Sequence, residues 1–346
     1  MVVSLVSLSR PAEPPADEPT PRPTPARLGS LAYAVRGDIY VADWNGSDPV
    51  RIAYGRPPSD CQGVGEYSAQ APIWSPDGRY LAYLHMDCNA PAFQTPGSWW
   101  DVVISDAEGN VVTSFPSESW GISWSPDSTR VAVWVNAPAD PPLREAGDRS
   151  TIGVYGLNGE RQTLLTLPDS AAGIRNPVWS PDGRSLLLDK FEIPLDGSTP
   201  RPLPWAVRRG WALSPDGSRV AYSHKSLFVA AADGSAGVEV LADGASPNLL
   251  WSPTGDRIAF TSQRSRELRL VDVATGTVTL LIEPDGSAVL SVIEFSPDGD
   301  RILFSRTEEA GTGANSLWSV NADGSDLRRL VTGTASGDWD SPSPTR

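Results

Sequence analysis

Trp74-Ser75-Pro76-Asp77-Gly78 is the first of six closely similar five-residue motifs in this sequence. The other five begin at Trp124, Trp179, Leu213, Trp251 and Phe295. Each motif is followed by a basic or polar residue and then by an apolar run, as in Leu81-Ala82-Tyr83. Six copies are more than chance would give, so the motif marks an internal repeat.

The residues of the motif are those of a tight turn between two antiparallel strands. Proline presets φ for the second turn position, aspartate suits the next one, and glycine accepts the positive φ from which the second strand departs. The large residue before the serine ends the first strand and faces the neighbouring sheet. Ser128 replaces the glycine in the second motif, and we expect it to strain that turn or to alter its type.

A second turn follows each motif and is centred on a glycine. These turns contain Glu108-Gly109, Asn158-Gly159, Asp196-Gly197, Asp233-Gly234, Thr275-Gly276 and Asp323-Gly324. Because each lies between two strand-like runs, every repeat supplies four strands, here named A, B, C and D. Repeated four-stranded sheets of this length are the blades of a β-propeller. We therefore expect an all-β propeller of four-stranded antiparallel blades.

The two ends of the chain decide the number of blades. Residues 31–54 supply strands B, C and D but no strand A, whereas Asp338-Trp339-Asp340-Ser341-Pro342 resembles a strand A with its turn. If this segment completes the first blade, the ring is closed by both ends and has no exposed sheet edge. Seven blades over residues 28–346 average about 46 residues each, close to the usual period. Trp339 is one residue further from its proline than in the other motifs, so it needs a bulge to face correctly; six blades with loose ends is the alternative.

The segment before the propeller has a different composition. Residues 11–27 contain seven prolines, which favours a stiff, extended tether. Val2 to Leu8 is an apolar run too short to span a bilayer. We expect residues 1–27 to be a disordered proline-rich tether and residues 28–346 to be one propeller domain. A tether of this kind favours export to the periplasm or the extracellular space, with a cytoplasmic location as the alternative.

The charge of the chain excludes two classes of partner. The net charge is −14 and the pI is about 4.6. A nucleic-acid-binding protein needs clustered lysine and arginine to neutralise phosphates, and an anionic membrane surface would repel this chain. We therefore expect no binding to nucleic acid and no direct membrane insertion of the propeller. The protein is also expected to be a monomer.

The six motifs resemble the WD-like propeller repeat of the TolB family, which also occurs in prolyl oligopeptidase-type peptidases. The resemblance covers residues 28–346 and implies the propeller fold. TolB looks like a periplasmic protein-interaction factor with an additional α/β domain before its propeller, and no such domain fits here. The peptidases carry an α/β-hydrolase domain, for which this chain has neither the length nor a Gly-x-Ser-x-Gly motif.

The lengths of the connections indicate where a site lies. In an up-and-down blade the A–B and C–D turns lie on one face, and the B–C and D–A connections lie on the other. The turns are short and uniform in sequence. From the last motif position to the glycine turn there are 31 residues in the repeats that begin at Trp74 and Trp124, against 14 to 25 in the others, and residues 55–70 also form a long connection. Extra chain therefore gathers over blades one to three, and such loops on a rigid scaffold usually carry recognition.

Several side chains in these connections are candidates for contact with a protein or carbohydrate partner. They are His85, Asp87, Trp99, Trp100, Asp101 and Asp140. Two adjacent tryptophans beside acids would anchor a sugar, a peptide or a cationic partner. The alternative is that one of the two tryptophans begins strand C and packs between blades.

Cys61 and Cys88 fall in neighbouring connections of the same face. A disulfide between them is sterically reasonable in an oxidising compartment. The alternatives are two free thiols or a zinc site with His85, which lacks a clear fourth ligand. We therefore predict a disulfide, and neither a metal site nor a cofactor.

No catalytic motif is recognisable in the sequence. The chain has only two histidines, His85 and His224, at equivalent positions near the ends of two B strands. No Ser–His–Asp pattern, phosphate-binding loop, dinucleotide fingerprint or calcium loop is present. We interpret the chain as a non-catalytic binding propeller for a protein or glycan. The alternatives are a hydrolase or lyase that uses carboxylates in the central funnel, and an extracytoplasmic sensor domain of a membrane-anchored protein.

Overall fold

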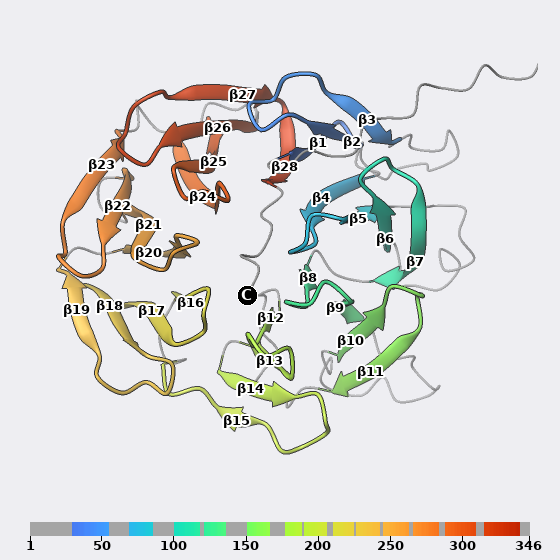
Figure 1. The fold of residues 1–346 in the computed structure, drawn as a ribbon, viewed down its shortest axis with the longest axis horizontal. Helices are drawn as coiled ribbons and strands as arrows, with labels where there is room; N and C mark the ends of the chain where they lie inside the picture. The colour runs from blue at the N-terminus through green and yellow to red at the C-terminus, as the bar shows by residue number, and fades with distance from the viewer. Residues whose placement is uncertain are drawn as a thin grey trace, which may run out of the picture.

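The computed structural model describes thirteen stretches of the chain. They are residues 30–54, 69–85, 100–117, 121–135, 151–166, 177–188, 190–205, 210–224, 226–242, 245–262, 266–283, 288–308 and 315–339. Strands in these stretches form seven four-stranded antiparallel sheets, arranged in a ring as the blades of a β-propeller (Figure 1). None of the described segments forms a helix with the length and apolar character needed to cross a bilayer.

Each blade runs from strand A near the centre of the ring to strand D at its rim (Figure 1). Blade one contains β28 (Thr334–Trp339), β1 (Leu31–Val35), β2 (Asp38–Ala42) and β3 (Val50–Ala53). Blade two contains β4 (Ala69–Trp74), β5 (Tyr80–His85), β6 (Trp100–Asp106) and β7 (Val111–Ser117). Blade three contains β8 (Ile122–Trp124), β9 (Arg130–Val135), β10 (Thr151–Gly156) and β11 (Arg161–Thr166).

The remaining four blades follow the same order. Blade four contains β12 (Val178–Trp179), β13 (Ser185–Leu188), β14 (Phe191–Pro194) and β15 (Arg201–Pro202). Blade five contains β16 (Gly210–Leu213), β17 (Arg219–His224), β18 (Ser226–Ala231) and β19 (Val238–Leu241). Blade six contains β20 (Ala245–Trp251), β21 (Arg257–Ser262), β22 (Leu268–Asp272) and β23 (Val278–Ile282). Blade seven contains β24 (Val289–Phe295), β25 (Arg301–Thr307), β26 (Asn315–Asn321) and β27 (Arg328–Thr332).

The ring is closed by β28, which pairs with β1 although the two lie at opposite ends of the chain. Trp339 is the register partner of Leu31, just as Trp74 is the partner of Leu81 in blade two. Trp339 therefore has the register of a motif aromatic residue, and the bulge in this pair lies at the other end, between Ala34 and Val35. The seven-bladed prediction is confirmed, and the six-bladed alternative is wrong.

The hydrophobic core is divided into seven clusters, one between each pair of adjacent blades. The motif aromatics lie in these clusters and are almost fully buried. The indole N–H of Trp179 donates to the carbonyl of Ser123 in the preceding blade at 3.0 Å. Trp124 and Trp251 make the same bond to the blades before them. These three tryptophans therefore link their blades to the preceding ones.

The serine and aspartate of the motif stabilise the A–B turn. In blade two, Ser75 Oγ donates to Asp77 Oδ1 at 2.7 Å and accepts the backbone N–H of Tyr80 at 2.9 Å. Blade six has Thr254 in place of the aspartate, and there Asp256 Oδ1 accepts the hydroxyl of Ser252 at 2.7 Å. In each of the six described motif turns one aspartate accepts the serine hydroxyl, and in blade six this aspartate lies two residues later in the sequence.

Ser128 keeps the turn geometry of the glycine that it replaces. Its φ is +59°, close to the +69° of Gly78, and its N–H donates to the carbonyl of Ser125 as in the other turns. The expectation of a different turn type is therefore wrong, whereas the expected strain of a left-handed non-glycine residue is present. The Ser128 side chain is buried, and its Oγ accepts the backbone N–H of Asp77 in blade two at 3.0 Å.

Substitution of Ser128 should separate these two contributions. Ser128→Ala keeps the strained φ but removes the acceptor for the Asp77 N–H, so we expect a loss of about 1–2 kcal/mol in the free energy of unfolding. Ser128→Gly loses the same bond but relieves about 1–2 kcal/mol of backbone strain, so it should be close to neutral. Urea unfolding of both variants checks the order, and a glycine variant as unstable as the alanine variant would contradict it.

Arginines at the first position of strand B form a second link between blades. The Nη2 groups of Arg130 and Arg257 donate to the motif glycine carbonyl of the next blade, at 2.9 and 3.0 Å. Arg219 makes the same contact to Gly255. The guanidinium of Arg130 also lies 4.8 Å from the ring centre of Trp179. The charged residues that recur with the motif are thus used in blade contacts.

Candidate functional site

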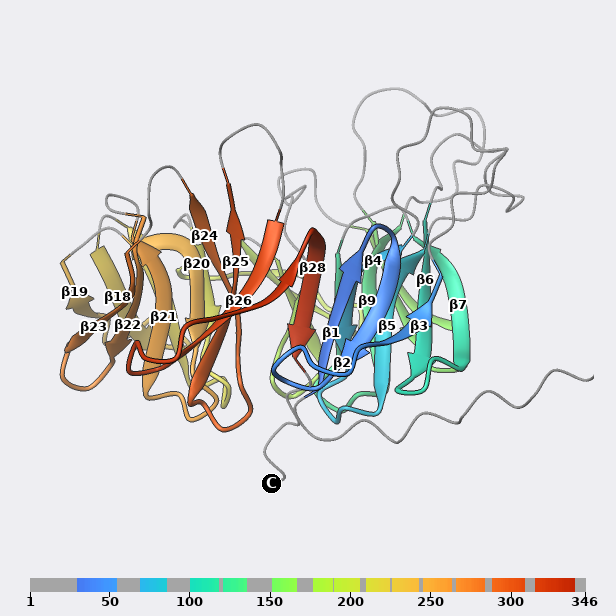
Figure 2. The same cartoon turned by 90° about the horizontal axis from the view of Figure 1, so that it is seen from above.

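The two faces of the ring differ in their connections (Figure 2). The A–B and C–D turns lie on the lower side in Figure 2, here called the turn face, and the B–C and D–A connections leave the opposite side, the loop face. Residues 86–99 connect β5 to β6 and residues 136–150 connect β9 to β10. In blades four and five the same connections are only residues 189–190 and residue 225. The long connections of the loop face therefore belong to blades two and three, together with residues 54–68 between blades one and two.

The structure describes some of the predicted site residues at this face. His85 ends β5 and is the register partner of Asp101 in β6, and both are partly buried. Trp100 is the first residue of β6, which confirms that one tryptophan of the pair begins strand C. His224 ends β17 of blade five, the position equivalent to that of His85. Asp87, Trp99, Asp140, Cys61 and Cys88 lie outside the described residues, so their roles and the disulfide remain predictions.

Hydrogen bonds in the motif turns of blades three to seven lower the pKa of one carboxyl group in each turn. Hydrogen bonds from the hydroxyls of Ser214 and Ser218 lower the pKa of Asp216 from 3.8 to about 2. Burial acts to raise the pKa of Asp298, but hydrogen bonds from Ser296 and from the Asp300 N–H outweigh it, and that pKa is lowered. A general acid needs the opposite shift, so these aspartates act as acceptors in turns. Among the described residues, no three histidine, cysteine or acidic side chains come together to form a metal site.

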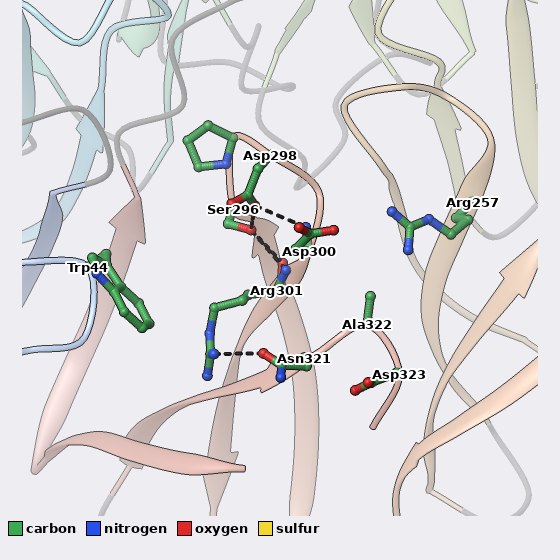
Figure 3. Close-up of a pocket in the computed structure, with 10 residues that line it drawn as sticks. Trp44, Arg257, Ser296, Asp298, Asp300, Arg301, Asn321, Ala322 and Asp323 are labelled. Atoms are coloured by element: carbon green, nitrogen blue, oxygen red, sulfur yellow. Dashed lines mark hydrogen bonds between the residues drawn. The ribbon is translucent and has the colours of Figure 1, made fainter. Parts of the chain in front are cut away.

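A pocket of about 760 Å³ opens on the turn face, where blade seven meets blades six and one (Figure 3). It is lined by Trp44, Arg257, Ser296, Pro297, Asp298, Asp300, Arg301, Asn321, Ala322 and Asp323. The sequence indicates candidate residues only on the loop face and predicts uniform turns on the turn face. That expectation is wrong at this pocket, because one turn of blade one carries a large aromatic residue.

Trp44 forms one side of the pocket and lies in the turn between β2 and β3. In the glycine turns of the other six blades, the same position holds small or aliphatic residues: Ala107, Leu157, Leu195, Ala232, Ala274 and Ala322. The motif tryptophans are at most 7% exposed, whereas Trp44 is 41% exposed. The tryptophan at position 44, where the other turns have small or aliphatic residues, is visible in the sequence and is the signal that indicates the pocket.

Arg301 lies beside Trp44 and differs from the arginines of the other blades. Its Cζ is 5.0 Å from the Trp44 ring centre. Its Nη1 donates to Asn321 Oδ1 at 2.6 Å and to Asp326 Oδ2 at 2.9 Å, within its own blade. Its Nη2 donates to Ser319 Oγ at 3.1 Å. Both terminal nitrogens of Arg301 therefore donate hydrogen bonds within blade seven. The positive charge of this guanidinium is balanced by Asp326, and its side chain forms one wall of the pocket.

The carboxylates of the pocket are not equivalent. Asp298 Oδ1 accepts Ser296 Oγ at 2.6 Å, and Asp323 Oδ1 accepts Ser325 Oγ at 2.6 Å, so both stabilise their own turns. No side chain or backbone group of the described residues holds the Asp300 carboxylate, which is exposed at the pocket (Figure 3). The pocket thus combines an indole surface with a carboxylate that no turn uses.

The seven blades and the repeated turn contacts define a TolB-type, WD-like β-propeller. No family model matches the chain. Over 223 residues the chain is 31% identical to the uncharacterized protein Atu1656 of Agrobacterium fabrum, an alignment that covers 57% of this chain and 71% of that protein. The chain belongs to the family of this protein.

Two solved structures show the same fold. TolB from Acinetobacter baumannii superposes with a TM-score of 0.51 at 17% identity, over 90% of this chain and 67% of that one. The β-propeller domain of Cps50 (Swd1) from Myceliophteria thermophila superposes with a TM-score of 0.54 at 14% identity, over 77% of this chain and 87% of that one. At these identities the likeness establishes the propeller, a fold that often serves as a protein-binding scaffold.

Proposed function

We propose that this chain is a non-catalytic binding propeller that holds a protein or glycan partner on its loop face, over blades one to three. The observation that carries the proposal is the grouping of the long connections. Residues 54–68, 86–99 and 136–150 all leave the same face from consecutive blades, whereas the B–C connections of blades four and five are only residues 189–190 and residue 225. Loops grouped on a rigid scaffold are the usual place for recognition.

The strand ends below these connections supply suitable side chains. His85 and Asp101 are register partners where β5 ends and β6 begins, and Trp100 precedes Asp101. Aromatic residues beside polar groups are the usual anchors of an interface. The recurring serine, aspartate, arginine and tryptophan side chains are engaged in turns and blade contacts, which supports a scaffold role for the repeats.

The proposal includes a location and a domain arrangement. The chain is an exported monomer in which the proline-rich residues 1–27 tether the propeller of residues 28–346. Its net charge of −14 favours a partner with a basic surface, since electrostatic complementarity accelerates association.

Affinity capture with matched variants tests the proposed face. A partner captured by the intact chain should be recovered equally by His224→Ala, because this residue occupies the position of His85 on a blade with a one-residue connection. The double variant Trp100→Ala, Asp101→Asn should weaken binding of the purified partner by about tenfold or more, as expected for interface anchors. Equal affinity of the double variant and the intact chain would contradict the proposed site.

A further inference from the structure

We propose that the pocket on the turn face is a second binding site, which takes a basic side chain from an extended segment of a partner polypeptide. In this arrangement the cationic head of an arginine or lysine lies against Asp300, and its aliphatic stem lies on the indole of Trp44. The site lies on the opposite face from the loops of blades one to three, so it does not depend on the function proposed above.

The first observation is that a large part of the Trp44 side chain stays exposed after the blades have packed. Its contact with Arg301, at 5.0 Å, covers only part of the indole, which stays 41% exposed. The C–D turns of blades five and seven have an alanine at the position of Trp44, namely Ala232 and Ala322. The turn itself therefore does not require an aromatic residue. An exposed tryptophan on the wall of a pocket is typical of a binding anchor.

The second observation is that the A–B turn of blade seven has one carboxylate more than it needs. In blade six, Asp256 accepts the Ser252 hydroxyl because Thr254 replaces the motif aspartate. Blade seven retains the motif aspartate, and Asp298 accepts the Ser296 hydroxyl. Asp300, at the position of Asp256, is therefore released from this structural role and faces the pocket (Figure 3).

The third observation is the sign of the local charge. The pocket residues, their ion-pair partners and Arg328, which pairs with Asp326, comprise five carboxylates (Asp256, Asp298, Asp300, Asp323 and Asp326) and three guanidinium groups (Arg257, Arg301 and Arg328). Arg301 is paired with Asp326, and Arg257 donates to the Gly299 carbonyl at 3.0 Å. The excess charge is negative, which favours a cation over an anion at the indole face.

The placement of the pocket carboxylates on two separate turns favours a side chain on a polypeptide over a small amine. The pocket volume of about 760 Å³ is sufficient for more than one side chain. Asp300 belongs to the A–B turn and Asp323 to the C–D turn of blade seven (Figure 3). A peptide can reach both carboxylates with neighbouring basic residues, whereas a single cationic group contacts one.

A direct binding measurement tests the site. The probe is a fluorescein-labelled hexa-arginine amide, with hexa-citrulline amide as its neutral isostere, and fluorescence anisotropy gives Kd for the full chain. Trp44→Ala and Asp300→Asn should each raise Kd by about tenfold. Asp233→Asn is the matched control: it removes one exposed carboxylate at the equivalent of Asp323 in blade five, and Kd should change by less than about twofold. Trp44→Phe retains an aromatic wall and should keep most of the affinity.

Three outcomes would overturn the proposal. An equal rise in Kd for Asp300→Asn and Asp233→Asn would show general attraction to an acidic surface. An unchanged Kd for Trp44→Ala, in a variant with the thermal unfolding of the intact chain, would exclude the indole. Arginine amide binding as tightly as the hexapeptide would indicate a site for a small amine instead of a polypeptide.

Discussion

Removal of residues 334–346 should abolish the cooperative unfolding transition of the intact ring. These residues include β28, which supplies strand A of blade one and pairs with β1 over five register positions. Without it, Leu31 and Tyr33 lose the strand that pairs with them; both belong to the cluster between blades seven and one, which also contains Leu303 and Leu317. The lost backbone bonds, at about 1 kcal/mol each, and the newly exposed apolar surface together approach the typical total stability of about 5–15 kcal/mol.

Thermal unfolding followed by circular dichroism measures this effect. The control is a chain that ends at Asp340, which keeps β28 and should retain most of the stability of the intact chain. A synthetic peptide of residues 334–346 added to the shortened chain should restore part of the lost stability, because it can pair with β1 as a separate strand. A shortened chain with an unchanged midpoint would show that β28 does not close the ring in solution.

Gly217→Ala should cost about 2–5 kcal/mol of unfolding free energy, and Gly197→Ala only about 1–2 kcal/mol. Both glycines have positive φ, +67° and +83°, so both variants carry the strain of a left-handed alanine. A Cβ at Gly217 would also lie 2.2 Å from Pro181 Cγ in the motif turn of the preceding blade, whereas nothing lies within 4 Å of a Cβ at Gly197. The ring of Pro181 cannot rotate away, so blades four and five would have to move apart.

Urea unfolding of the two glycine variants gives the comparison. The difference between them isolates the contact between turns of adjacent blades, because the backbone strain is common to both. Equal losses would mean that backbone conformation alone requires the motif glycine, and that the close approach of Pro181 contributes nothing to its role.

The fold was predictable because its information is local and repeated. Pro76, Asp77 and Gly78 specify a turn through their own backbone preferences, and six copies fix the period. Residues 31–54 lack a strand A, which identifies them as part of an incomplete blade. The segment around Trp339 resembles the motif that ends strand A, which identifies it as the missing strand. The register of Trp339 was harder to predict, because the bulge lies at the far end of its strand.

The pocket could not be derived in the same way. Trp44 comes from blade one and Asp300 from blade seven, so only ring closure brings them together. The unusual residue at position 44 was visible in the sequence, but the surplus carboxylate at position 300 is recognised only when the hydrogen bonds of Ser252 and Ser296 are compared. Asp101 and His85 were easier to find, since they are adjacent in register on neighbouring strands.

The links between blades have a consequence for how such a chain can evolve. At the junction of blades three and four, Arg130 donates forward to Gly183 and Trp179 donates back to Ser123, and blades five and six are joined by the same two bonds. Each of these repeats supplies the donors and the acceptors of both bonds. An in-frame duplication of one repeat would therefore create a new junction between blades in which both bonds can form. The ring can therefore gain or lose whole modules by recombination without a new interface having to be invented, whereas the junction at Arg301 is specialised and should stay fixed.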